Sequence, residues 1–521
     1  MKIVVAEKIA EAAIEVLENV PGWTVVGPEQ FALDPEAAVA DADALIVRSA
    51  VQADARLIEA GRSLRVIGRA GVGVDNIDVE VATRRGIVVM NAPGASAVSV
   101  AELTLGLMLA MARHIPRADY STRSGKWEKK SLQGTELSGK TLGIVGLGRI
   151  GNETALRARA FGMKIVGSDP YLAPARAKEL GIELVPLDEL YARADYISLH
   201  LALTHQTAGM INAEAIAKMK KGVRLVNCAR GELVDEVALD AALRSGKVAA
   251  AALDVFSEEP TKNSSLLAAP NLVATPHLGA STREGQEAVG IQIARQIRDY
   301  LLKGIAQNAV NLPSLSDVEY RQIEPYMTLA GRLGRFAAQL FSSNLAEIEV
   351  KFEGEVGGLK TQLIRASAVA AILSSDGDEA NVINALAAAE ERGVVVRESR
   401  TDPEARVNLI HLKLAGPTGS VECSGALVHG SSPRLIHLNG IDIESHLEGD
   451  FLVVGNIDAP GVVGSIGTLL GRKGINIARL SLGREGRRAL AIVQVDEHVG
   501  PDVLASLRQA GSVQSVALVK V

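Results

Sequence analysis

Short aliphatic runs alternate with longer segments of helical periodicity over residues 1–312, and this alternation is the feature that most restricts the fold. The runs are KIVV, DALIVRS, LRVIGRAG, GIVVMNAP, TLGIVG, MKIVGSD, YISLHL, GVRLVNCA and AAALDV. Continuous apolar runs of this length are typical of parallel strands that are buried on both faces, and parallel strands need a crossover between them. The sequence therefore predicts repeated βα units and an α/β fold.

The order of the runs divides this region into two lobes. Four runs precede an apolar helical segment, AVSVAELTLGLMLAMARH, after which LSGKTLGIVG begins a second βαβ series. A turn-rich segment, residues 309–322, closes the region. We therefore expect two α/β lobes before residue 312.

The C-terminal part of the chain has a different pattern, and a length of 521 residues favours three or four domains in all. Residues 325–448 contain a helical segment, YMTLAGRLGRFAAQLF, and alternating runs such as EIEVKFEG, VNLIHLKLAG and GSVECSGALVHG, which predict a separate α+β domain with antiparallel strands. Residues 449–521 predict strand, helix, strand, strand, helix, strand. This is the ferredoxin-like βαββαβ order.

The composition argues against several classes of partner. The chain has 55 Lys+Arg and 61 Asp+Glu, a net charge of -6 without long charged blocks, which disfavours nucleic acid and membrane surfaces. Its two cysteines, Cys228 and Cys423, cannot form a disulfide framework. The N-terminus, MKIVVAEKIAEAA, matches a first strand and not a signal peptide, and no run approaches the ~18 apolar residues of a membrane helix. We expect a soluble, cytoplasmic protein.

The sequence Gly146-Leu-Gly148-Arg-Ile-Gly151 follows the strand TLGIV and opens a helix, which is the context that a Rossmann dinucleotide fingerprint requires. Gly146 permits the tight turn, Gly148 lets the backbone approach a pyrophosphate, and Gly151 lets the helix pack on the strand. Asp169 ends the next strand. Its carboxylate suits ribose hydroxyls and repels a 2′-phosphate, so NAD is expected rather than NADP. No metal is expected.

Three polar residues follow later strands and together suit hydride transfer. Arg230 can bind a carboxylate in bidentate fashion, His277 can accept the proton of a hydroxyl, and Glu259 can orient the imidazole and stabilise its protonated form. Singly, each has a structural explanation: a surface salt bridge, a helix cap and a solvated turn, respectively. Their combination after parallel strands indicates an active site.

The segments NCARG, LDVFSEEP and ATPHLGAST, at these separations, resemble the signatures of the D-isomer-specific 2-hydroxyacid dehydrogenases. The resemblance implies that Arg230, Glu259 and His277 are catalytic in an NAD-dependent dehydrogenase of a small 2-hydroxy acid. One departure is visible, because HLALTHQT has Ala202 where the family has proline.

The resemblance also implies a discontinuous substrate domain, residues 1–95 with 285–312, and an NAD-binding Rossmann domain over residues 96–284. The NAD contacts that it implies are Val72, Gly146, Gly148, Arg149, Ile150, Gly151, Asp169, Cys228, Ala229, Arg230, Asp254, His277, Gly279 and Ala280.

The loop GRAGVGVDNID, residues 68–78, has glycines that free backbone N–H groups to hold a carboxylate. The candidate substrate-binding residues are Arg48, Ser49, Arg69, Gly71 and Gly73. Positive charge for a phosphorylated substrate could come from Arg48, Arg69 and Lys129 or Lys130 near Trp127, although a surface or structural charge is the stronger expectation for each of them judged alone.

The tail narrows the resemblance. The segment DAPGVVGSIGTLLGRKGINI, with Pro460-Gly461 before its helix and Asn476 opening its second strand, resembles an ACT regulatory module. The whole chain resembles the long branch of the family, with an intervening domain (316–448) before the ACT domain (449–521). That branch oxidises D-3-phosphoglycerate to 3-phosphohydroxypyruvate with NAD, in the first step of L-serine biosynthesis.

The long branch further implies a homo-oligomer, expected to be a tetramer, and L-serine as an effector. The positions that match its serine contacts are Asn456, Asp458 and Asn476, and Asn456 departs from the His or Tyr often found there. In the intervening domain, a solvated helical face is a stronger expectation for Arg321, Arg332 and Arg335 than an anion site.

Two alternatives stay open. The closer one is a dehydrogenase of another phosphorylated 2-hydroxy acid, such as erythronate 4-phosphate. The other is an NAD-sensing transcriptional corepressor of the same fold, but an ACT tail is foreign to that group and the composition offers no nucleic-acid surface.

Overall fold

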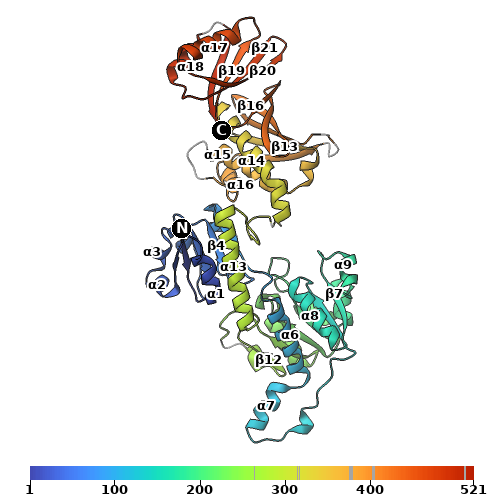
Figure 1. The fold of residues 1–521 in the computed structure, drawn as a ribbon. Coiled ribbons are helices and arrows are strands. Elements are labelled where there is room, and N and C mark those ends of the chain that lie inside the picture. The colour runs from blue at the N-terminus through green and yellow to red at the C-terminus, as the bar shows by residue number, and fades with distance from the viewer. Residues whose placement is uncertain are drawn as a thin grey trace.

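The structure is a computed structural model that describes residues 1–262, 265–313, 315, 317–374, 380–401, 405, 407–509 and 512–521. Its strands form four sheets that follow one another along the chain. Figure 1 shows an elongated molecule, with helix α7 at one end and helices α17 and α18 at the other. The first two sheets belong to the predicted α/β lobes.

The first lobe contains a parallel sheet with the strand order β2-β1-β3-β4-β5, the flavodoxin-like doubly wound order. Strands β1, β3 and β4 are buried along nearly their whole length, as their continuous apolar runs require. The elements are β1 Lys2–Val5, α1 Glu11–Glu18, β2 Thr24–Val26, α2 Pro28–Leu33, α3 Pro35–Val39, β3 Ala44–Val47, α4 Ala55–Ala60, β4 Val66–Arg69, α5 Val79–Arg84 and β5 Val88–Met90.

The second lobe contains a parallel sheet with the order β12-β11-β10-β9-β6-β7-β8. The chain reverses direction across the sheet between β6 and β9, and ligands of open α/β sheets bind at such a switch point. The elements up to β9 are α6 Ala97–Ala112, α7 Ile115–Arg123, β6 Thr141–Val145, α8 Arg149–Ala160, β7 Lys164–Ser168, α9 Pro174–Glu179, β8 Glu183–Leu184, α10 Leu187–Arg193 and β9 Tyr196–Leu199. Those that follow are α11 Ala213–Lys218, β10 Val223–Asn227, α12 Glu236–Ser245, β11 Val248–Leu253, β12 Leu272–Ala274 and α13 Arg283–Lys303.

Helix α13 returns the chain to the first lobe. Its Ile293 and Ile297 share a core with Ile3 and Val5 of β1. The first lobe is therefore completed by a helix that follows the second lobe in sequence. The domain limits given above remain a prediction.

Three strands of these two sheets are absent from the sequence prediction. They are β2, β8 and β12, which contain three, two and three residues. Runs this short show no apolar pattern that distinguishes them from a loop.

The third sheet has the order β14-β13-β15-β16-β17-β18 and lies against a long helix, α14. The prediction of antiparallel strands is wrong for one pair: β13 and β14 run parallel, because two helices cross over between them. The prediction that residues up to 322 form turns is also wrong, since α14 begins at residue 317. The elements are α14 Asp317–Leu340, β13 Glu347–Glu353, α15 Thr361–Leu373, α16 Ala385–Glu391, β14 Val395–Thr401, β15 Leu409–Gly416, β16 Gly419–Val428, β17 Ser432–Leu438 and β18 Ile441–His446.

The fourth sheet confirms the predicted ferredoxin-like order. It is antiparallel, with the strand order β20-β21-β19-β22. One face packs on its own helices, and the other shares a core with the third sheet, where the rings of Phe336 and Phe451 meet edge to face at 6.4 Å. The elements are β19 Asp450–Ile457, α17 Val462–Arg472, β20 Ile477–Glu485, β21 Arg488–Val495, α18 Pro501–Arg508 and β22 Val513–Lys520.

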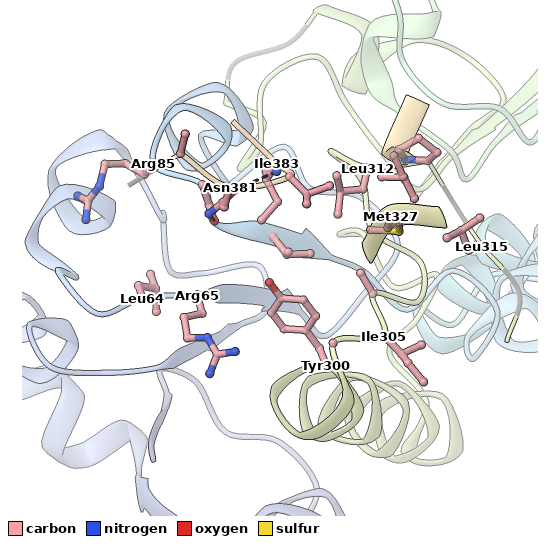
Figure 2. A pocket seen from close by; sticks show the side chains of 18 of the residues that line it. Leu64, Arg65, Arg85, Tyr300, Ile305, Leu312, Leu315, Met327, Asn381 and Ile383 are labelled. Atoms are coloured by element: carbon pink, nitrogen blue, oxygen red, sulfur yellow. Dashed lines mark hydrogen bonds between the residues drawn. The ribbon is translucent and has the colours of Figure 1, made fainter. Parts of the chain in front are cut away.

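A cavity of about 690 Å³ lies at the junction between the first lobe and the third sheet's helices. In Figure 2, Tyr300 and Arg65 line it from the first lobe, and Met327 lies across from them. Beside the cavity the Asn381 side chain donates a hydrogen bond to the Gly86 carbonyl at 2.9 Å. The first lobe and the intervening region are therefore in direct contact.

Within the described ranges, no single helix is both long enough and apolar enough to cross a membrane. Among the helices that the structure describes, only α6 and α7 pass such a test as a pair, and they are bent by 62° where they meet.

Candidate active site

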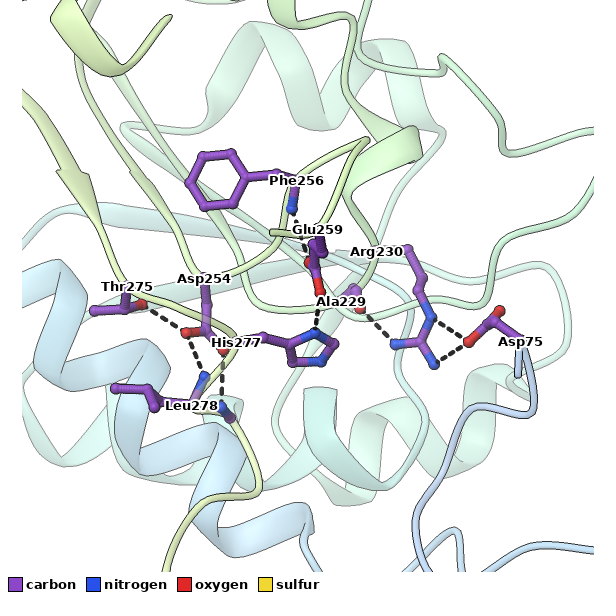
Figure 3. Close-up of polar contacts among 10 residues, drawn as sticks. Asp75, Ala229, Arg230, Asp254, Phe256, Glu259, Thr275, His277 and Leu278 are labelled. Carbon is purple, nitrogen blue, oxygen red and sulfur yellow. Dashed lines mark hydrogen bonds and ion pairs between the residues drawn. The ribbon is translucent and has the colours of Figure 1, made fainter. Parts of the chain in front are cut away.

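The predicted catalytic side chains lie at the carboxyl ends of neighbouring strands in the second sheet. Arg230 follows β10, Glu259 follows β11 and His277 follows β12. Because parallel strands end at the same edge of a sheet, these residues converge although 47 positions separate the first from the last. Figure 3 shows them in one view, with Glu259 against the His277 ring and Arg230 nearby.

Glu259 fixes one side of the His277 ring. Nδ1 of His277 lies 2.7 Å from Oε2 of Glu259. The other carboxylate oxygen of Glu259 accepts a hydrogen bond from the Phe256 amide at 3.0 Å, which holds the carboxylate in place. This arrangement leaves Nε2 of His277 to exchange a proton with a bound hydroxyl.

Asp254 holds the loop that carries His277. Its fully buried carboxylate accepts hydrogen bonds from the amides of Leu278 and Gly279 and from the Thr275 hydroxyl, at 2.7, 2.8 and 2.6 Å. His277 has a positive φ of 53°, a conformation that L residues rarely adopt without such support. Asp254 thus positions the imidazole; the NAD contact predicted for it stays a prediction.

Arg230 contacts the first lobe. Its Nε and Nη2 both bind Oδ2 of Asp75, at 3.1 and 3.0 Å, and its Nη1 donates to the Ala229 carbonyl at 2.7 Å. Gly73 makes room for this pair, since a Cβ at that position would lie 1.6 Å from Nη2 of Arg230.

Two cavities meet at His277. One, of about 490 Å³, lies between the two lobes beside β9 and β10, and the other, of about 680 Å³, lies at the end of the first sheet against α13. His277, Arg69 and Ala280 line both of them. The imidazole therefore stands between two chambers of ligand size.

The first of these cavities contains many of the predicted NAD contacts, and we call it the cofactor cavity. The predicted residues that line it are Val72, Ile150, Cys228, Ala229, Arg230, His277, Gly279 and Ala280. Gly73, predicted to bind substrate, also lines it.

The glycine loop after β6 fits a dinucleotide. Gly146 has φ of 90°, and a Cβ there would lie 2.4 Å from the His200 carbonyl. A Cβ at Gly151 would lie 2.2 Å from the Gly146 carbonyl, whereas at Gly148 it would meet nothing within 4 Å. Two glycines thus build the loop, and the third leaves open space at the N-terminus of α8, where a pyrophosphate would bind.

Asp169 lies beside this loop, and its predicted ribose contact stays a prediction. Its carboxylate accepts hydrogen bonds from the amides of Leu147 and Tyr171, at 2.7 and 2.8 Å. The side chain of Arg149 lies over Gly94, because a Cβ at that glycine would be 2.0 Å from an Arg149 nitrogen. The residues present therefore fit NAD.

The second cavity, which we call the substrate cavity, contains four of the five predicted substrate residues: Arg48, Ser49, Arg69 and Gly71. Burial lowers the pKa of the Arg69 guanidinium, and the neighbouring Arg230 lowers it further. A Cβ at Gly71 would lie 1.5 Å from a terminal nitrogen of Arg69. The glycines of this loop therefore admit two guanidinium groups, a role that the sequence prediction missed.

Lys129 and Lys130 line neither cavity; they lie in an exposed 3-10 turn, Lys129–Ser131, beyond α7. Two cations that sequence reasoning missed, Lys8 and Arg283, do line the substrate cavity. Lys8 comes three residues after β1, so its position after a parallel strand could have identified it from the sequence. Arg283 is the first residue of α13 and carries no such signal.

Sequence reasoning also missed polar groups of the cofactor cavity. Asn91 follows β5, and its side chain donates to the Val72 carbonyl at 2.5 Å. His200 follows β9; burial lowers its pKa to about 4, so the ring is neutral near pH 7. Cys228, a predicted NAD contact, forms no disulfide, and burial raises the pKa of its thiol to about 12, which makes the thiol an inert part of the cavity wall. In the described part of the chain, no group of His, Cys, Asp or Glu is arranged to hold a metal.

The predicted effector residues lie in the fourth sheet. Asn456 is buried, and its amide donates to the Ile457 carbonyl at 2.9 Å. Asp458 lies 3.5 Å from Arg484, and Asn476 donates to Asp496 at 2.6 Å.

The three arginines of α14 do not converge. Arg321 and Arg335 are exposed, and Arg332 donates to the Leu447 carbonyl at 2.9 Å. Both Arg321 and Arg332 belong to α14, and a rise of 1.5 Å per residue places them about 16 Å apart along the helix axis. The structure therefore favours a solvated helical face over an anion site for these arginines.

Three known domain families match successive parts of the chain. Residues 105–279 match the NAD binding domain of D-isomer specific 2-hydroxyacid dehydrogenases, residues 322–439 the D-3-phosphoglycerate dehydrogenase intervening domain, and residues 451–512 the ACT domain. The D-3-phosphoglycerate dehydrogenase of Methanocaldococcus jannaschii is 42% identical over 523 residues, which cover 100% of this chain and 99% of that protein. This chain belongs to the D-3-phosphoglycerate dehydrogenase family.

A second member of the D-3-phosphoglycerate dehydrogenase family, from Bacillus subtilis, is 37% identical and covers 99% of this chain and 99% of its own. Among solved structures, D-lactate dehydrogenase from Aquifex aeolicus, complexed with NAD and lactic acid, matches with a TM-score of 0.54 at 28% identity. It covers 60% of this chain and 100% of its own length. Membership of the D-3-phosphoglycerate dehydrogenase family makes this chain an NAD-dependent oxidoreductase and confirms the predicted fold class and cofactor.

Proposed function

We propose that this enzyme oxidises D-3-phosphoglycerate to 3-phosphohydroxypyruvate with NAD, as the first step of L-serine biosynthesis. The observation that carries the proposal is the position of His277. This residue is hydrogen-bonded to Glu259 and lines both the cofactor cavity and the substrate cavity, and four cations line the substrate cavity. The names of the full-length relatives support the same substrate.

In the proposed reaction His277, Glu259 and Arg230 each have a separate role that follows from the charge of the side chain. Bound NAD would supply the acceptor for the hydride that leaves C2 of the substrate. His277 takes the hydroxyl proton through Nε2, and Glu259 stabilises the imidazolium that results. Arg230 binds the C1 carboxylate and polarises the adjacent oxygen as the carbonyl forms. The products are the 2-oxo acid, the reduced cofactor and one proton.

The phosphate would lie at the far end of the substrate cavity. The cations that line this cavity are Lys8, Arg48, Arg69 and Arg283, and the acidic lining residues are Glu259 and Glu287. Arg48 donates to the Lys8 carbonyl at 2.9 Å, so these two cations are neighbours. The N-terminus of α13 faces the same cavity through Arg283 and Gln286, which favours an anion there.

Initial rates of NADH formation with D-3-phosphoglycerate and with D-glycerate test this assignment. Two charge-assisted hydrogen bonds to the phosphate should favour the phosphorylated acid by about 100-fold or more in kcat/KM. Equal values for the two acids would contradict it.

A dehydrogenase of another phosphorylated 2-hydroxy acid is the alternative, and erythronate 4-phosphate in the same assay decides between them. The same cations serve both substrates, so the length of the cavity must distinguish them.

We also propose that L-serine regulates the enzyme through the ACT domain. The enzyme is proposed to be a tetramer. The domain limits are proposed to be those given in the sequence analysis. Asn476 is exposed and lies just before β20, where its amide donates to Asp496. Titration of serine into the wild type and Asn476→Ala should give weaker inhibition in the variant. Identical responses would exclude that residue, and light scattering measures the mass of the assembly.

A further inference from the structure

The ion pair between Asp75 and Arg230 joins the two lobes at the proposed active site (Figure 3). Asp75 belongs to the loop after β4 in the first lobe, and Arg230 follows β10 in the second. The two residues are 155 positions apart in sequence. Neither Asp75 nor this contact is part of the predicted site.

Protein groups occupy two sides of the Arg230 guanidinium through hydrogen bonds. A single oxygen of Asp75, Oδ2, accepts hydrogen bonds from Nε–H and from one N–H of Nη2. The Ala229 carbonyl accepts one from an N–H of Nη1. A guanidinium has one further N–H on each terminal nitrogen. Within the described residues these two have no other partner, and they form the edge that binds a carboxylate in bidentate fashion.

Gly73 serves the same arrangement. A Cβ there would lie 1.6 Å from Nη2 of Arg230 and 2.6 Å from Oδ2 of Asp75. Any side chain at position 73 would therefore displace the guanidinium from its partner. The conformation of the loop, as well as the charge of Asp75, determines where Arg230 lies.

We propose that Asp75, with Gly73, is a positioning residue that holds Arg230 with its free edge toward the substrate carboxylate. The inference rests on the proposed role of Arg230. A held guanidinium loses less side-chain entropy when the carboxylate binds, so the effect should appear in the affinity for the 2-hydroxy acid. The opposite view is that Asp75 competes with the substrate for Arg230, and this predicts the opposite sign.

Steady-state kinetics of Asp75→Ala distinguish the two views. Positioning predicts that the KM for D-3-phosphoglycerate rises about tenfold, that kcat falls less than KM rises, and that NADH affinity stays at the wild-type value. A fall in KM would establish competition and overturn the proposal, and so would an unchanged KM.

Two further variants separate charge from geometry. Asp75→Asn keeps an acceptor oxygen without the charge and should give a KM between those of the wild type and Asp75→Ala. Gly73→Ala keeps the carboxylate but displaces the guanidinium, and it should raise KM as Asp75→Ala does. If Gly73→Ala fails to fold, as its thermal unfolding would reveal, the two Asp75 variants decide.

Asp188→Ala is the matched control. The Asp188 side chain is 68% exposed and that of Asp75 is 64% exposed, so the two are closely matched. Asp188 forms an ion pair with Lys218 and lines neither cavity. Its removal should leave KM unchanged. A wild-type enzyme that does not oxidise D-3-phosphoglycerate would refute the proposed function; an active wild type with an unaffected Asp75→Ala variant would refute only the positioning role.

Discussion

The Glu259 carboxylate lies 2.7 Å from Nδ1 of His277 and is itself held by the Phe256 amide. One ring nitrogen is therefore committed to the protein. In the proposed mechanism the other nitrogen, Nε2, carries out the proton transfer, and the residue that bears it lines both cavities.

His277→Asn should reduce kcat by about 10²–10⁴-fold and leave the NADH dissociation constant nearly unchanged, because Asn cannot accept the hydroxyl proton. Single-turnover rates and NADH fluorescence measure the two quantities. His205→Asn, at an exposed histidine outside both cavities, is the control. Loss of NADH affinity with intact chemistry would refute the assigned role.

Gly148→Ala should fold normally and bind NADH about tenfold or more weakly, because its Cβ meets no protein atom within 4 Å but would occupy the proposed pyrophosphate site. Gly151→Ala should instead lower the thermal unfolding midpoint, since its Cβ would lie 2.2 Å from a backbone oxygen. Gly106→Ala, in open space on α6, is the control. Unchanged NADH affinity in Gly148→Ala would place the dinucleotide elsewhere.

Asp169→Ala should lower the ratio of kcat/KM for NAD to that for NADP by about 10–100-fold, because the carboxylate that repels a 2′-phosphate is lost. Asp169 also binds the Leu147 amide, so the affinity for NAD should fall as well. Asp169→Asn keeps an acceptor for that amide and separates the two effects. An unchanged NAD to NADP ratio in both variants would count against the ribose contact.

The buried His200 should make the fold sensitive to acid. Its folded pKa is about 4 and the ordinary value is 6.5, so the unfolded chain binds the proton more readily between these values. Stability is therefore lost as the pH falls from about 6.5 toward 4, and the loss amounts to about 2 kcal/mol between pH 7 and pH 5. Thermal unfolding at pH 7 and 5 should show a smaller loss for His200→Gln. An equal loss in variant and wild type would contradict this.

The sequence predicted the glycine loop and the catalytic residues because both signals are local. Gly146, Gly148 and Gly151 lie within six residues, and the candidate catalytic residues stand in the short segments NCARG, LDVFSEEP and ATPHLGAST. Asp75 could not be found in this way. Its partner is in another lobe, and only the packing of the lobes brings the two side chains together.

The errors in the fold have a similar cause. Whether β14 runs parallel or antiparallel to β13 depends on where the helices between them lie, and the strand sequence carries no information on that point. The room that Gly71 makes for Arg69 is likewise a property of the folded loop, because the same glycines are equally consistent with exposed backbone amides.

The contact between Phe336 and Phe451 has a practical consequence for dissecting this enzyme. A fragment that ends before β19 would present an uncovered apolar surface on α14 and would tend to precipitate, since Phe336 is almost fully buried against the last sheet. The intervening and ACT domains should therefore be expressed as one piece that begins before α14 and runs to the last residue.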